Sequence, residues 1–153
     1  MSQENVDIVR RVIAAFIEGD YERLIELSDP QVEYDVSRTS PESRVVRGPE
    51  EVLAVLEEWI DTWDEHQVEL VELIDAGDER VVAVIHERGK LKGSDAWVEH
   101  PRGVVYTVRD QRVVRYEEHQ DRGTQIARRQ RDPPASTRSQ GQTASSRPQD
   151  PVG

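Results

Sequence analysis

Cysteine is absent from this 153-residue chain, which excludes disulfide bonds, a thiol nucleophile and thiolate metal ligands. Basic residues are scarce as well, because 20 Lys and Arg stand against 31 Asp and Glu and leave a net charge of −11. A chain of this charge repels nucleic acid phosphates and anionic lipid. No stretch approaches the ~18 apolar residues that a membrane-spanning helix needs. We therefore expect neither nucleic acid nor a membrane as a partner.

We also expect no secretion signal. The beginning of the chain, MSQENVDIVRR, has no basic segment followed by an apolar run. The absence of cysteine fits a reducing compartment. Together these features favour a cytoplasmic protein.

The hydrophobic content of 35% is enough for one modest core. The composition changes at residue 128, after which Arg, Ser, Gln and Pro dominate and Val152 is the one large aliphatic residue. Such a segment buries too little apolar surface to offset the conformational entropy lost on ordering. We predict one domain over residues 1–127 and a disordered tail over residues 128–153, to which we assign no function.

Apolar residues recur at helical spacing in three segments near the beginning of the chain. The first helix has Ser2 as its expected N-cap and ends at Gly19, and the second begins after Asp20 and ends before Asp29-Pro30. Gly48-Pro49 opens a third, because proline is favoured at the first helical position. The expected buried stripes are Val6, Val9, Ile13, Phe16 and Ile17, then Leu24, Ile25 and Leu27, and finally Val52, Leu56, Trp59 and Trp63.

The remainder of the chain alternates as strands do. After a strand-like segment at residues 31–37 and a polar loop through Pro41, four strands are expected at residues 68–75, 80–92, 95–109 and 112–121. The turns between these four are short enough for hairpins. Helices followed by a meander predict an α+β fold in which the helices cover one face of a curved antiparallel sheet.

The turns also predict which residues face one another. A two-residue loop at Asp110-Gln111 pairs Val105 with Tyr116 and Gly103 with Glu118. The same count places together, on the helix-covered face, Val71, Leu73, Val82, Val84, Val105 and Val114 with Glu69, His86, Arg88, Trp97, Glu99, Tyr116 and Glu118. It places Val104, Tyr106, Val108 and Val113 on the outer face. A bulge at Pro101 is the alternative, and would exchange the faces of all residues before it.

The motif order then points to a family. The segment SQENVDIVRRVIAAFIEGDYERLIELSDPQVEYD contains a helix, Gly-Asp, a helix, Asp-Pro and a strand, and it is followed by VRGPEEVLAVLEEW, LIDAGDERVVAV and YTVRDQRVVRYEEHQD. Over residues 1–127 the chain resembles the SnoaL-like, ketosteroid-isomerase-like branch of the nuclear transport factor 2-like superfamily. The resemblance implies a cone-shaped fold of three helices on a curved sheet. The superfamily includes isomerases, cyclases, dehydratases, epoxide hydrolases and proteins without catalytic activity.

The resemblance also implies candidate site residues. Polyketide cyclases and epoxide hydrolases of the superfamily carry an Asp on the last strand, and EHQD places Glu118 at a similar position, one methylene longer. The isomerases carry their base on the first strand, near VEYD, which suggests Asp35, whereas alternation with apolar neighbours favours Tyr34 as the inward residue. His86 is either a base or an orienting partner, or else a satisfied strand histidine. The expected substrate-binding residues are Tyr116, Trp97, Arg88, Glu99, Trp59 and Phe16.

Two functions remain open at this point. In the first, a cofactor-independent acid/base enzyme, of isomerase, cyclase, dehydratase or epoxide-hydrolase type, acts on a small apolar cyclic molecule through Glu118. In the second, the same cone is a non-catalytic ligand-binding or dimerisation module. The apolar outer residues named above favour a homodimer through the outer sheet face. The scattered histidines lack the spacing of a metal site, and we expect neither a metal nor a cofactor.

Overall fold

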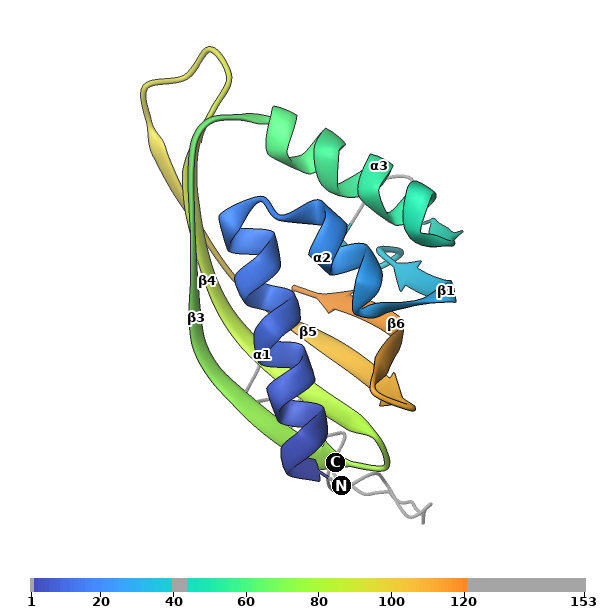
Figure 1. Ribbon diagram of the computed structural model, residues 1–153. Coiled ribbons are helices and arrows are strands. Elements are labelled where there is room, and N and C mark those ends of the chain that lie inside the picture. Colours follow the sequence, from blue (N-terminus) through green and yellow to red (C-terminus); the bar gives the residue numbers. More distant parts are fainter. Residues whose placement is uncertain (1, 40–43, 121–153) are drawn as a thin grey trace, which may run out of the picture.

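The computed structural model describes residues 2–39 and 44–120. Within these ranges three helices pack on the concave side of a curved six-stranded sheet (Figure 1). The helices are α1 (Ser2–Glu18), α2 (Tyr21–Glu26) and α3 (Pro49–Asp61), and the strands are β1 (Ser28–Asp35), β2 (Val45–Arg47), β3 (Trp63–Gly77), β4 (Arg80–Leu91), β5 (Trp97–Arg109) and β6 (Arg112–His119). The predicted α+β cone is confirmed. The predicted tail at residues 128–153 lies outside the described residues.

The helices begin at the expected residues, but α2 ends at Glu26, earlier than the expected stop at Asp29-Pro30, which lies in β1. Gly19 has a φ of 75°, a left-handed conformation that glycine adopts without steric cost, and ends α1. The carboxylate of Asp20 accepts a hydrogen bond from the backbone N of Arg23 at 3.2 Å and caps α2. Pro49 is the first residue of α3. The expected capping by the Ser2 side chain lies outside what the structure describes.

The sheet has the strand order β2-β1-β6-β5-β4-β3. The β4–β5 hairpin has the predicted register, with Arg88 opposite Glu99 and Lys90 opposite Trp97, and it stays regular through Pro101. The sheet is mixed, since β1 pairs with β6 in parallel whereas the other neighbours are antiparallel. No tight turn joins β1 to β6, so local geometry does not impose an antiparallel direction on this pair.

One extra residue interrupts β6. Val108 lies opposite Val113, but the next residue along β5, Thr107, lies opposite Arg115. Val114 is therefore left without a partner of its own, which is a β-bulge. Because side chains alternate strictly along a strand, this bulge reverses the phase of the rest of β6 relative to β5.

The bulge changes the partners of the polar residues. Tyr116 lies opposite Tyr106, and Glu118 lies opposite Val104. The predicted pairing of Val105 with Tyr116 is wrong by one residue. The inward face of β5 therefore carries Val104 and Tyr106, whereas Val105 turns to the other face.

The outer patch predicted from the same count is also wrong. All four of its residues are buried in the main core: Val104, Tyr106, Val108 and Val113. On the opposite side of the sheet, Val82 and Val105 form a small separate cluster with Ala76. A homodimer remains a prediction, but these four residues no longer support it.

The main core lies between the helices and the concave face. It includes the predicted inward residues of the first strand, Val32, Tyr34 and Val36. Four stripe and strand positions differ from expectation: Ile17 is 49% exposed, Ile25 is 36% exposed, Val71 is 57% exposed, and Trp63 begins β3 instead of extending α3. Among the described residues, no helix is both long and apolar enough to cross a membrane.

Candidate active site

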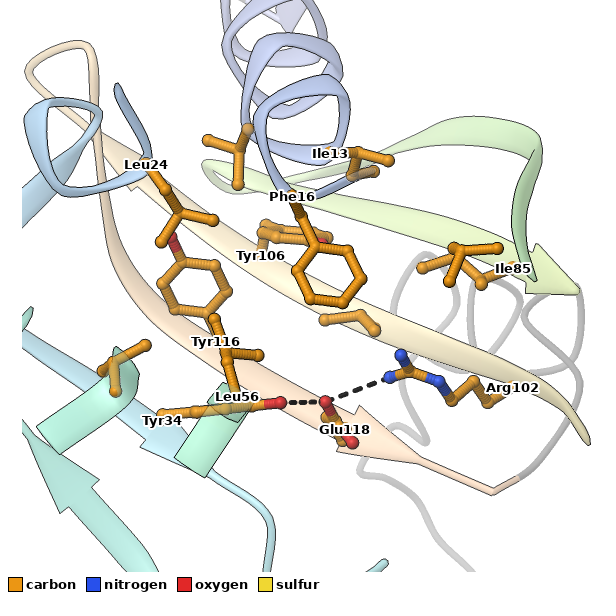
Figure 2. A pocket seen from close by; sticks show the side chains of 14 residues that line it. Ile13, Phe16, Leu24, Tyr34, Leu56, Ile85, Arg102, Tyr106, Tyr116 and Glu118 are labelled. Atoms are coloured by element: carbon orange, nitrogen blue, oxygen red, sulfur yellow. Dashed lines mark hydrogen bonds and ion pairs between the residues drawn. The ribbon is translucent and has the colours of Figure 1, made fainter. Parts of the chain in front are cut away.

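Two cavities meet inside the cone at Tyr34, Arg102 and Glu118, which line both of them. The inner cavity is about 40 Å³, and Figure 2 shows the side chains around it, among them Phe16, Leu56, Ile85, Tyr106 and Tyr116. The outer cavity is about 440 Å³ and is lined further by Val36, Thr39, Arg44, Val55, Glu58, Trp59, Thr62 and His100. The three shared residues thus form a polar boundary between an apolar chamber and a larger, more polar one.

Glu118 is the central carboxylate of this boundary. The hydroxyl of Tyr34 donates a hydrogen bond to its Oε2, and the hydroxyl of Thr39 donates to its Oε1 at 3.3 Å. The Nη1 atom of Arg102 lies 3.0 Å from Oε2 (Figure 2). Glu118 reaches this position because the bulge in β6 turns it toward the helices.

Arg102 connects Glu118 to a second carboxylate, Glu87, on the neighbouring strand. Arg102 Nε donates to Glu87 Oε1 at 2.9 Å, and the two side chains are 7% and 0% exposed. The indole N–H of Trp59 donates to Glu87 Oε2 at 2.8 Å, and Nε2 of His66 bonds the same oxygen. An ionised carboxylate only accepts hydrogen bonds, so the proton of this last bond belongs to His66.

Burial and neighbouring charges determine the protonation of these groups. Burial raises the pKa of Tyr34 well above its ordinary value, and the negative charge of Glu118 raises it further. Burial alone would raise the pKa of Glu87, but the hydrogen bond from His66 and the attraction of Arg102 outweigh it and lower that pKa to about 2. At neutral pH, Tyr34 is therefore a hydrogen-bond donor and Glu87 a fixed negative charge.

The walls of the inner cavity are aromatic. The ring of Tyr116 lies 5.7 Å from that of Tyr34 and 5.3 Å from that of Tyr106. Burial raises the pKa of Tyr116 to about 12, although its hydrogen bond with Ser28, at 2.8 Å, acts in the opposite direction. These phenols are neutral at physiological pH and serve as cavity walls.

Five of the predicted site residues come together in this region. Tyr34 and Glu118 lie at the boundary, Phe16 and Tyr116 line the inner cavity, and Trp59 lines the outer one. They come from α1, α3, β1 and β6, so the site exists only in the folded cone.

Asp35 lies on the opposite side of β1 from Tyr34. Its carboxylate pairs with Arg115 at 2.7 Å and accepts hydrogen bonds from the backbone N and the hydroxyl of Ser37. Burial would raise the pKa of Asp35, but the Ser37 bonds and Arg38 lower it. Asp35 lines neither cavity, so its catalytic role has no support from the geometry of the site.

The other four predicted residues also lie outside the cone, on the outer face of the β4–β5 hairpin. His86 Nε2 lies 2.9 Å from a carboxylate oxygen of Glu99, and the Arg88 guanidinium lies 4.3 Å from the centre of the Trp97 ring. The phase reversal at the β6 bulge is the physical reason, because these side chains share the face of Val105. His86 therefore has the structural role that the sequence left as an alternative.

Three residues of the polar network were not predicted from the sequence. Arg102 follows Pro101 and lies in phase with Val104 and Tyr106, while Glu87 lies in phase with Ile85. The signal was present in this alternation, but it depends on the register of β6. The sequence around His66 gives no comparable signal. Within residues 2–39 and 44–120, no group of three or more His, Asp or Glu side chains is placed to hold a metal ion.

The family model of the SnoaL-like domain matches residues 9–116, more than half of the chain. No curated protein matches. A nuclear transport factor 2-like protein from Burkholderia xenovorans is 25% identical, with a TM-score of 0.64 over 78% of this chain and 90% of that one.

Two further solved structures share the fold at lower identity. TerC, co-crystallised with polyporic acid, is 17% identical with a TM-score of 0.66 over 77% of this chain and 92% of that one. A protein with a ketosteroid isomerase-like fold from Catenulispora acidiphila, in complex with trimethylamine, is 15% identical with a TM-score of 0.62 over 73% and 83%. The family match covers most of the helices and strands that build the cavities but ends before Glu118, and the chain belongs to the SnoaL-like domain family.

Proposed function

We propose that this protein is a cofactor-independent acid/base enzyme that acts on a small, mostly apolar cyclic molecule. The observation that carries the proposal is the position of Glu118, a carboxylate at the boundary of two cavities with a neutral phenol donor beside it. In the reaction, the hydroxyl of Tyr34 turns from Glu118 Oε2 to donate to a substrate oxygen, and the carboxylate of Glu118 takes a proton from a substrate carbon. The proton then returns to another carbon or to the same one.

Cavity size favours the outer chamber as the place of the substrate ring. A cavity of about 150 Å³ accommodates a benzene ring, whereas the inner chamber is about 40 Å³. The outer chamber, at about 440 Å³, lies in the range of small-molecule sites. A ring in the outer chamber would lie beside Trp59 and His100 and send only a small substituent past Glu118.

The charges favour a neutral substrate. Arg102 lies between the carboxylates of Glu87 and Glu118, and the other guanidinium of the outer cavity, Arg44, pairs with Glu58 at 2.6 Å. An anionic substrate would therefore meet cations that already have carboxylate partners, which weakens its attraction. A neutral molecule with one acceptor oxygen fits the hydroxyl of Tyr34 without this cost.

The family and fold support this proposal at a coarse level. The two structures of similar fold that contain polyporic acid and trimethylamine are examples of small molecules bound to such a cone.

A specific observation favours a second function, a non-catalytic binding module. Glu118 already has three partners, Tyr34, Thr39 and Arg102. A carboxylate satisfied in this way also suits a pocket that only holds a ligand. The two functions differ in whether Glu118 exchanges protons with carbon.

Deuterium exchange distinguishes them. Wild type and Glu118→Gln are incubated in D₂O with a monoterpene ketone and a steroid ketone, and incorporation at the carbons beside the carbonyl is followed by mass spectrometry. Binding is measured in parallel by the shift in melting temperature. The enzyme function predicts exchange by the wild type and a loss of about 100-fold or more in Glu118→Gln. Binding of both ketones without exchange would instead establish the binding module.

A further inference from the structure

Glu87 is a fully buried carboxylate that lines neither cavity. Burying an ion costs several kcal/mol unless partners compensate the loss of water. The preceding inward residues of β4, Ala83 and Ile85, are apolar and pack in the main core. If this position had only a packing role, another apolar side chain would fill it without the cost of burying a charge.

The partners of Glu87 come from three different elements. Arg102 of β5 donates to its Oε1 at 2.9 Å, and Trp59 of α3 donates to its Oε2 at 2.8 Å. His66 of β3 bonds the same Oε2 and is stacked on Trp63, with ring centres 5.2 Å apart. Arg102 and Trp59 both line the outer cavity, so Glu87 holds two cavity residues without touching the cavity.

The orientation of Arg102 depends on this contact. Its Nε is occupied by Glu87, which leaves the guanidinium edge facing Glu118, with Nη1 3.0 Å from Oε2. Nη1 is fully buried and, although it forms this ion pair, its N–H bonds are not aligned on an acceptor. Without the carboxylate of Glu87, the Arg102 guanidinium would be free to turn and align with Glu118.

We propose that Glu87 is a positioning residue, which holds Arg102 beside Glu118 and Trp59 in the cavity wall and thereby sets the geometry at which Glu118 meets a substrate. The part that concerns the substrate rests on the proposed function. The part that concerns Arg102 and Trp59 rests on the contacts alone.

Nuclear magnetic resonance of the full chain tests the contacts. In the wild type, the indole N–H of Trp59 and the Nε–H of Arg102 should exchange with solvent much more slowly than the indole N–H of Trp97, which is 38% exposed. Trp59→Phe and Arg102→Lys assign the signals. In Glu87→Gln both signals should move. The amide of Gln has a single acceptor oxygen, whereas Arg102 and Trp59 donate to different oxygens of the Glu87 carboxylate. Glu87→Asp, which keeps the charge, should restore them in part.

Deuterium exchange of the ketones tests the consequence. Glu87→Gln should lower the rate at saturating ketone by about tenfold to 100-fold, as expected when a reacting group is displaced by about 1 Å, and should change the half-saturating concentration far less. Val82→Ala is the matched control, since Val82 is fully buried on the same strand but on the opposite face. It should destabilise the fold and leave both the two signals and the exchange rate unchanged.

The outcomes separate the two proposals. Absence of exchange in the wild type would count against the proposed function, whereas unmoved Trp59 and Arg102 signals in Glu87→Gln would overturn the positioning role. An exchange rate in Glu87→Gln equal to that of Val82→Ala would overturn it as well. If Glu87→Gln does not fold, the wild-type measurement decides, because Trp59 and Arg102 protons that exchange as fast as the Trp97 proton would refute the contacts.

Discussion

The buried charge of Glu87 predicts a particular dependence of stability on pH. Substitution Glu87→Gln removes a carboxyl whose pKa is lowered in the folded protein and leaves a side chain of nearly the same shape. A carboxyl whose pKa is lowered in the folded state stabilises the native state at pH values above its pKa in the unfolded state. This stabilisation disappears as the pH falls toward the pKa of the folded state. The variant lacks this contribution at every pH.

The magnitude follows from the two pKa values. The difference between an ordinary value of 4.5 and about 2 corresponds to about 3 kcal/mol of unfolding free energy. This contribution is complete above about pH 5.5, and about 2 kcal/mol of it is lost by pH 3. The pKa values of Asp35 and Glu117 are also lowered, but both groups are present in the two proteins and cancel in the difference.

Urea unfolding at pH 7, 5, 4 and 3, followed by circular dichroism, measures this difference. Wild type should be more stable than Glu87→Gln by about 3 kcal/mol at pH 7, and the two curves should approach one another below pH 5. Curves that stay parallel from pH 7 to pH 3 would refute the reasoning. They would mean that Glu87 titrates in the same way in the folded and unfolded states.

Four further substitutions test the fold around the site. Gly89→Ala should destabilise the protein by about 1–3 kcal/mol in urea, because an added Cβ would lie 2.5 Å from both the Trp63 ring and the carbonyl oxygen of Glu65; an unchanged midpoint would show that both the ring and the backbone of β3 move aside. Ser28→Ala and Tyr116→Phe, singly and together, should show a coupling of about 1 kcal/mol, since their hydroxyls lie 2.8 Å apart in the core, and strict additivity would disprove that bond. Gln111→Gly should raise the stability by about 1 kcal/mol, because Gln111 has a φ of 65° in the β5–β6 turn; a lower melting temperature would contradict this assignment.

Local sequence signals were sufficient for the elements and the fold. Gly19, Asp20 and Pro49 mark helix boundaries through backbone geometry that each residue imposes by itself. The inward position of Tyr34 followed from its apolar neighbours on β1. These features depend on a few adjacent residues, and such residues are visible in the sequence.

The composition of the site was decided by the tertiary structure. Val113 and Val114 are both apolar, so alternation along β6 fits either phase equally well, and only packing against β5 places the bulge at Val114. That single extra residue brings Glu118 together with Arg102 and turns His86 to the outer face. The sequence alone determined a SnoaL-like cone with Tyr34 facing inward, and the family resemblance pointed to Glu118. The network of Glu87, Arg102 and their partners required the folded sheet, because a register between strands is a property of their pairing and not of either strand alone.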